Sequence, residues 1–267
     1  MAAANVYFDL TRAFNARGPA VALASGQAVV YYRVAIMSKD GDWVVREDPA
    51  ACARVLEVLA DRGAWYRPGA PLDARWLSGG WSSHFEYRDE RERRVRCDFF
   101  SRPPRVDHAA LDRRIAAARD PLAAIDLESL IRMKQTQRDK DYAVIGALAA
   151  RLPPAIELQW TMDVDRVLAL APAHGAGMTR PAVAAAVRGD RDGVVIGLAR
   201  ERDRLQRADR IRVEAYASAA REFLAAFGAL SPAARALPQA HGEVCRLAER
   251  WLPTRVTWPE AGDADAQ

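Results

Sequence analysis

The sequence has few of the residues that build disulfide or zinc scaffolds. Its three cysteines, Cys52, Cys97 and Cys245, lie far apart, and neither a Cys-x-x-Cys pair nor a histidine cluster accompanies them. An odd number of scattered cysteines is not the pattern of a disulfide-stapled secreted domain, and the ligand spacing of a structural zinc site is missing. We therefore expect a reducing, cytoplasmic environment and no zinc centre.

Long apolar runs and a basic leader are also missing. The sequence never approaches the roughly 18 consecutive apolar residues that mark a membrane-spanning helix. Residues 1–9 contain no basic side chain and end on an acid, which is unlike the start of a secretory signal. The sequence therefore predicts no membrane partner.

Lysine is also rare in this sequence. Arginine supplies every basic position except Lys39, Lys134 and Lys140, and it carries most of the net charge of +4. A compact ammonium on a flexible stem can reach a phosphate in ways that a planar guanidinium cannot, so we treat these lysines as candidate functional residues. The charge permits a nucleotide or nucleic-acid partner without requiring one.

The 267 residues, 50% of them hydrophobic and 28% charged, have the balance of a globular chain with room for two modest domains. Short strands alternate with helices in residues 1–152, a helical domain follows at 153–260, and 261–267 has the composition of a disordered tail. Apolar periodicity predicts strands at 20–24, 43–45, 83–87 and 95–100. It predicts helices at 4–16, 27–33, 49–61, 127–136, 140–152, 155–169, 180–188, 196–227 and 240–251. Residues 199–212 alternate arginines with acids, which fits either a solvated helix or one that faces nucleic acid.

Three aspartates are the leading candidates for chemistry. Asp40 and Asp42 stand on alternate residues, so an extended chain points both to the same side. In the predicted strand 95–100, alternation places Asp98 with Arg96, away from Phe99. Aspartate has a low propensity for strands, so its presence in this strand hints at a functional role. Three carboxylates are suitable ligands for two divalent cations such as Mg²⁺. The plain alternative for Asp40 and Asp42 is a polar loop before a strand.

Candidates for binding phosphate or taking part in the chemistry lie near these aspartates and in a second stretch further along the chain. The Ser25-Gly26 turn, ahead of a short predicted helix, would let backbone N–H groups approach phosphate oxygens. Lys39 adjoins the first acid. His84, in the predicted strand 83–87, is either a base in the cleft or a histidine hydrogen-bonded to its neighbours. A second basic stretch, Met133 to Asp141, holds Lys134, Arg138, Lys140 and Asp141.

The order of these parts resembles the nucleotidyltransferase superfamily, whose fold is shared with DNA polymerase β. A glycine turn at Gly26 precedes the Asp40-x-Asp42 pair, and a strand bearing Asp98 follows. The stretch 127–141 is similar to a helix motif of minimal bacterial nucleotidyltransferases, a group that includes the toxin of AbiE-type abortive-infection systems. The resemblance covers about residues 5–150. Two positions depart from the pattern, because the turn begins with Ser25 and because Gly41 stands where an apolar residue is usual.

The resemblance implies an α+β fold with a small mixed sheet flanked by helices, followed by an all-helical C-terminal domain. It implies that Asp40, Asp42 and Asp98 are catalytic carboxylates for two Mg²⁺ ions. It assigns Ser25, Gly26, Lys134, Lys140 and Asp141 to the nucleotide. To these we add Lys39, which adjoins the acid pair, Arg96, which shares a strand face with Asp98, and Arg138 as candidate nucleotide-binding residues.

We therefore expect a metal-dependent enzyme that moves a nucleoside monophosphate from a nucleoside triphosphate such as ATP to an acceptor. The acceptor is RNA, for instance tRNA, or a protein or a small molecule, and a toxin paired with an antitoxin protein is one form of this expectation. The alternative is a catalytically silent module of the same fold that binds RNA or a partner protein.

Overall fold

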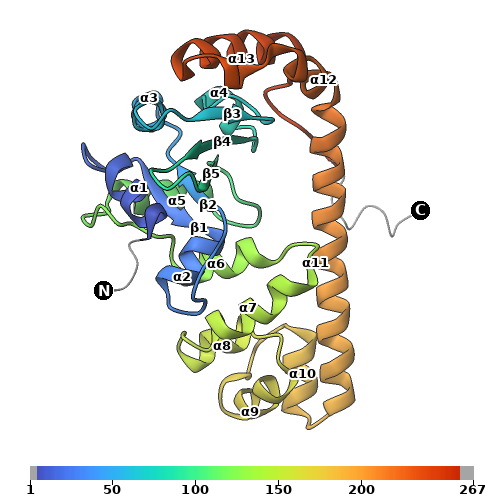
Figure 1. The fold of residues 1–267 in the computed structure, drawn as a ribbon. Coiled ribbons are helices and arrows are strands. Elements are labelled where there is room, and N and C mark those ends of the chain that lie inside the picture. The colour runs from blue at the N-terminus through green and yellow to red at the C-terminus, as the bar shows by residue number, and fades with distance from the viewer. Residues whose placement is uncertain (1–4, 259–267) are drawn as a thin grey trace. The chain divides into compact units, whose positions relative to one another are not determined.

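The computed structural model describes residues 5–258, and the chain divides into two compact units (Figure 1). The first unit contains residues 5–125 and Ala215–Thr257, and the second contains Asp126–Glu214 with Trp258. This division differs from the boundary predicted after residue 152, because the prolines at 153 and 154 only separate two helices of the second unit. The predicted tail at 261–267 lies outside the described residues.

A mixed five-stranded sheet forms the centre of the first unit, which confirms the expected α+β class. Its strands are β1 (Val21–Ala24), β2 (Gly41–Val45), β3 (Trp65–Arg67), β4 (Ser82–Arg88) and β5 (Arg94–Phe100), in the order β1-β2-β5-β4-β3. The pair β2 and β5 is parallel, and the other neighbours are antiparallel. The sequence missed β3, since three residues are too short to show an alternation.

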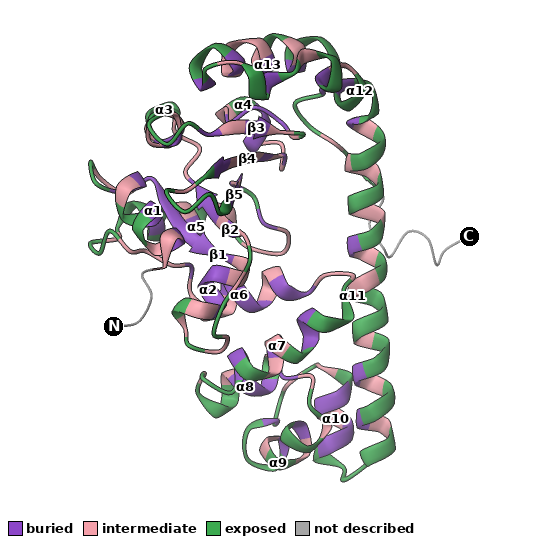
Figure 2. Cartoon of the chain, in the orientation of Figure 1, coloured by how far each residue is buried: buried purple, intermediate pink, exposed green. Residues whose placement is uncertain are grey.

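One face of the sheet carries the core of the first unit. Buried residues line the strands of the sheet, and in β5 they alternate with partly exposed ones (Figure 2). Trp43 of β2 stacks on Phe99 of β5 with 5.2 Å between ring centroids. Phe14 packs edge-on against both rings. The helices of this unit are α1 (Val6–Phe14), α2 (Ser25–Tyr31), α3 (Pro49–Ala60), α4 (Ala74–Leu77), α5 (His108–Ala116), α12 (Arg221–Leu230) and α13 (Leu237–Trp251), with a 3-10 turn, η1 (Pro232–Ala234).

Helices alone make up the second unit within the described residues. They are α6 (Leu127–Lys134), α7 (Asp139–Ala149), α8 (Pro154–Trp160), α9 (Val164–His174), α10 (Pro181–Val187) and most of α11 (Arg191–Ala219). The helix predicted at 155–169 is two helices, because Thr161 is extended and the Asp163 carboxylate caps a new helix by accepting from the Arg166 amide. None of the helices in residues 5–258 is both long and apolar enough to cross a membrane.

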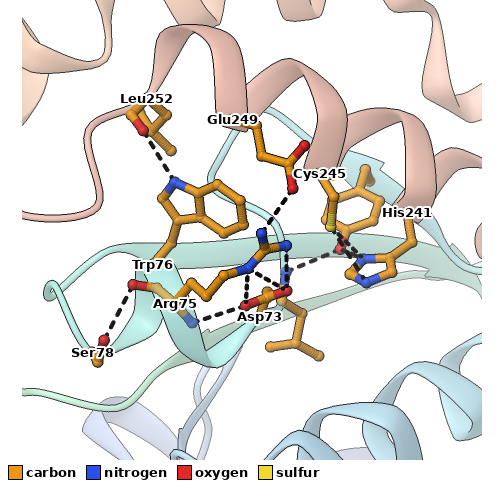
Figure 3. Close-up of polar contacts among 10 residues, drawn as sticks. Asp73, Arg75, Trp76, Ser78, His241, Cys245, Glu249 and Leu252 are labelled. Atoms are coloured by element: carbon orange, nitrogen blue, oxygen red, sulfur yellow. Dashed lines mark hydrogen bonds and ion pairs between the residues drawn. The ribbon is translucent and has the colours of Figure 1, made fainter.

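Polar contacts attach α13 to β3 and α4, although the two regions are far apart in the sequence (Figure 3). Arg75 pairs with Asp73 at 2.9 Å and with Glu249 of α13 at 2.7 Å. The hydroxyl of Tyr66 lies 2.7 Å from Nδ1 of His241 and accepts a hydrogen bond from the amide of Leu72. The indole of Trp76 donates to the carbonyl of Leu252 just beyond the helix. The last helix is thus fixed to the edge of the sheet.

The attachment of α13 should weaken in mild acid. Burial lowers the pKa of His241, so the folded protein resists a proton that the unfolded chain accepts below about pH 6.5. The contribution of His241 to the free energy of unfolding should therefore be fully present above that pH. The free energy of unfolding should fall as the pH drops from 7 to 5.5. Urea titrations across this range should give a shallower fall for His241→Asn, which retains a polar group near the Tyr66 hydroxyl.

His174→Asn is the control for this prediction, because His174 is exposed at the end of α9. It should reproduce the pH dependence of the unsubstituted protein. An equal slope in all three proteins would show that His241 contributes nothing to the loss of stability in acid.

Candidate active site

The face of the sheet opposite the aromatic core carries a row of polar side chains. Parallel pairing places Asp42 of β2 directly opposite Asp98 of β5. The next two strands continue the row, since Asp98 pairs with His84 of β4 and His84 pairs with Arg67 of β3. Laterally paired residues project to the same side of a sheet. Four strands thus bring Arg67, His84, Asp98 and Asp42 into one line.

The carboxylate of Asp98 has two basic neighbours. Nδ1 of His84 lies 2.7 Å from its Oδ1, and the guanidinium of Arg67 lies 3.3 Å from the same oxygen. The Asp98 side chain is 22% exposed, which keeps it within reach of solvent while the adjacent Phe99 is fully buried. Asp98 therefore faces away from the hydrophobic interior, as a role in chemistry requires.

Asp40 lies in the loop before β2, and that loop is held in place by two side chains. The amide of Gln27 donates to the carbonyls of Ser38 and Asp40, and the hydroxyl of Tyr7 donates to the carbonyl of Lys39 at 2.6 Å. The Lys39 side chain is exposed. The guanidinium of Arg96 lies 3.8 Å from the Asp40 carboxylate.

Arg96 has a second partner on its own face of the sheet. Its Nε lies 3.3 Å from the carboxylate of Glu86 on β4. Two acids thus share one guanidinium, which lies on the same strand face as Asp98, as the sequence predicted from alternation. The pattern of the predicted strand 83–87 did not single out Glu86 as a site residue.

The predicted phosphate-binding turn follows β1 directly. Ala24, the last residue of β1, pairs with Asp42, so Ser25 and Gly26 come immediately after the acid row. Ser25 has φ +44, a left-handed conformation that costs a non-glycine residue about 1–3 kcal/mol and is common at functional sites. A Cβ on Gly26 would lie 2.2 Å from the hydroxyl of Ser38, so glycine is needed there for the close approach of the loop.

Only two of the three predicted metal ligands share a row. Within residues 5–258 no three His, Cys, Asp or Glu side chains lie close enough together to hold a metal ion. Asp42 and Asp98 are in register, whereas Asp40 lies in the preceding loop beside Arg96. Two carboxylates still fit Mg²⁺, since this ion commonly takes one or two protein carboxylates and completes its shell with phosphate oxygens and water.

The predicted basic stretch lies in the second unit, where two of its residues form a buried ion pair. Nζ of Lys134 lies 3.3 Å from Asp141, and the two side chains are 9% and 5% exposed. Thr136 donates to Asp141 at 2.6 Å, and the Arg138 guanidinium also pairs with it. Burial raises the pKa of Asp141, but the Thr136 hydrogen bond and both cations outweigh it, and the pKa is lowered. Lys134 therefore neutralises an acid at the α6–α7 junction.

The remaining members of the stretch are accessible. Arg138 and Lys140 are exposed at the start of α7. Next to them, the buried carboxylate of Asp209 on α11 accepts from the Gln137 amide at 3.0 Å and pairs with Arg212. The α6–α7 connection is thus held by buried acids and leaves two cations at the surface.

Residues 199–212 form part of α11 and show the ion pairs expected of the first alternative, a solvated helix. Arg207 pairs with Asp203, and Glu201 pairs with Arg180 of the α9–α10 connection, as in a solvated, ion-paired helix. Arg200 and Arg204 are exposed on the same helix. The charges of α11 are therefore partly used in holding the second unit together.

The comparisons with known proteins give no relative for this chain. Neither a protein-family model nor a curated protein nor a solved structure matches it. The resemblance to nucleotidyltransferases thus depends on the motifs in the sequence.

The ion pair at the α6–α7 junction should be needed for stability. Replacing Lys134 by methionine keeps the length of the side chain but leaves the buried Asp141 carboxylate short of one positive partner. Breaking a buried pair typically costs about 3 kcal/mol, so Lys134→Met should lower the free energy of unfolding by roughly that amount in urea titrations.

Lys140→Met is the matched control, because Lys140 is exposed six residues away in the same stretch. It should leave stability almost unchanged. If the two variants unfold at the same urea concentration, the Lys134–Asp141 pair does not stabilise the fold.

Proposed function

We propose that this protein is a metal-dependent nucleotidyltransferase, which moves a nucleoside monophosphate from a nucleoside triphosphate to an acceptor hydroxyl or phosphate. The register that sets Asp42 opposite Asp98 carries the proposal. A turn that follows β1, an acid on β2 and an acid on the parallel strand β5 occur in the order expected of the nucleotidyltransferase fold. All three parts lie at one side of the sheet.

The proposed reaction is an in-line displacement at phosphorus. An acceptor oxygen forms a bond to the α-phosphorus, the bond from that phosphorus to the bridging oxygen breaks, and pyrophosphate leaves with the electron pair. A hydroxyl acceptor gives up its proton to a nearby base or to water. A bound divalent cation supplies charge neutralisation and acidifies the hydroxyl.

The residues of this chain have separate roles in that reaction. Asp42 and Asp98 would provide ligand oxygens for the cation, and Asp40, which lies beside Arg96 in the preceding loop, is the third candidate carboxylate. Backbone N–H groups at Ser25 and Gly26 bind phosphate oxygens. The mobile charge of Lys39, next to Asp40, neutralises the triphosphate. Arg138 and Lys140 are the accessible cations of the second basic stretch, which belongs to the second unit, whereas Lys134 and Asp141 are assigned to stability.

A silent binding module is the second candidate, and one observation favours it. The described residues lack a group of three metal-binding side chains. In that case the exposed arginines of α11 and the cations Arg138 and Lys140 would contact RNA or an antitoxin-like protein partner without any metal. The two candidates differ in their need for a nucleoside triphosphate and a divalent cation.

Label transfer from nucleotide tests the proposal directly. Purified protein is incubated with Mg²⁺, total RNA and each nucleoside triphosphate in turn, labelled at the α-phosphate, and products are separated by mass. Asp98→Asn should retain the fold and lose activity. Loss of a partner outside a metal's own ligands costs about 10–100-fold, so loss of a ligand should cost at least about 100-fold.

Asp112→Asn is the matched control for Asp98→Asn. Asp112 is 31% exposed and pairs with Arg46 at 3.2 Å, which resembles the Asp98–Arg67 pair in exposure and distance but lies away from the acid row. It should transfer label at the normal rate. Full activity in Asp98→Asn would refute the assignment of this carboxylate, and RNA binding without metal or transfer would favour the silent module.

A further inference from the structure

We propose that His84 is a positioning residue that fixes the Asp98 carboxylate for a divalent cation shared with Asp42. The inference rests on the proposed function and goes beyond it, because none of the roles proposed there belongs to His84. Nδ1 of His84 lies 2.7 Å from Oδ1 of Asp98, which is a short and direct contact between laterally paired residues.

The direction of this hydrogen bond follows from its acceptor. An ionised carboxylate has no proton to give, so Nδ1 of His84 carries the hydrogen and donates it. Among the described residues, both contacts to the Asp98 carboxylate, from His84 and from Arg67, end on Oδ1. The other oxygen, Oδ2, is left to accept a cation beside Asp42.

His84 is better suited than Arg67 to fix the carboxylate. The imidazole turns about two side-chain bonds and lies at 2.7 Å, whereas the longer arginine reaches Oδ1 only at 3.3 Å. A ring with few rotatable bonds loses little conformational freedom when it is held. Arg67 places a positive charge beside the same oxygen, and His84 sets the orientation of the Asp98 carboxylate.

A glycine makes room for this ring. A Cβ on Gly69 would lie 2.4 Å from Cδ2 of His84 and 3.1 Å from the backbone carbonyl of Ser82. The neighbouring amide of Ala70 donates to that same carbonyl, which holds the loop against β4. The backbone of Gly69 does not adopt a left-handed conformation, so glycine is needed here for the space it leaves and not for its backbone conformation. The imidazole of His84 is thus packed close to Gly69 and hydrogen-bonded to Asp98.

Partners that orient a ligand are as much a part of a metal site as the ligands themselves. Their loss typically reduces metal affinity about 10–100-fold, because the carboxylate then samples rotamers that do not face the ion. The same logic assigns Gly69 an indirect role, since a methyl group there would push the ring off its hydrogen bond.

Manganese binding followed by electron paramagnetic resonance tests the inference, with the full chain and without nucleotide. His84→Leu fills the space of the ring but removes the donor, and it should weaken Mn²⁺ binding about 10-fold or more. His84→Asn places an amide N–H near the position of Nδ1 and should stay within about 3-fold of the unsubstituted protein. Gly69→Ala should behave like His84→Leu. Thermal unfolding checks that each variant is folded.

His108→Leu is the matched control. His108 is 28% exposed and lies 3.2 Å from the Glu47 carboxylate, so it repeats the histidine–carboxylate contact of His84, which is 30% exposed, at a place outside the acid row. Its Mn²⁺ affinity should be unchanged. A purely structural role for His84 would instead lower the melting temperatures of His84→Leu and His108→Leu alike and leave Mn²⁺ binding intact.

The outcomes separate this inference from the proposed function. If the unsubstituted protein binds Mn²⁺ and His84→Leu binds it equally well, His84 does not position Asp98, while the metal site stands. If Asp98→Asn binds Mn²⁺ as well as the unsubstituted protein, or if the unsubstituted protein binds none, the metal site of the proposed function falls and the role of His84 falls with it. Weaker binding in His84→Leu and Gly69→Ala with rescue in His84→Asn supports the inference.

Discussion

The parallel pairing of β2 with β5 is the contact on which the candidate site depends. It sets Asp42 beside Asp98 on one face and stacks Trp43 on Phe99 on the other. A slip of one residue would exchange the two faces and bury a carboxylate among aromatic rings. The burial of two large aromatic side chains on one face of the sheet therefore enforces the position of the two acids on the other face.

The two units use charged residues in different ways. In the first unit the acids of the sheet face remain partly exposed beside Arg67 and Arg96. In the second unit Asp141 and Asp209 are buried and fully committed to nearby cations and backbone amides. Partial exposure is what a site for phosphate and metal needs, whereas burial with several partners is typical of a residue that holds a fold together.

Local patterns predicted much of the strand-containing part, and register accounts for most of what they missed. Alternation in 95–100 correctly separated Asp98 and Arg96 from Phe99, since side-chain direction in a strand is a local property. The neighbours Arg67 and Glu86 come from other strands, and their positions depend on pairings that one strand does not encode. Lys134 shows the same limit, because a scarce lysine in a motif is not distinguishable by sequence from one that neutralises a buried acid.

The first unit is built from two stretches of chain, with residues 126–214 of the second unit between them. This arrangement affects the order in which the two units can fold during synthesis. The indoles of Trp76 and Trp81 donate to the carbonyls of Leu252 and Pro253, and a Cβ on Gly79 would overlap the backbone carbonyl of Thr254. A growing polypeptide therefore leaves the ribosome with its sheet-bearing part unfinished until residues 252–254 have emerged. The continuous stretch 126–214 emerges whole before then, so during translation the later-encoded helical part is the first that can be completed.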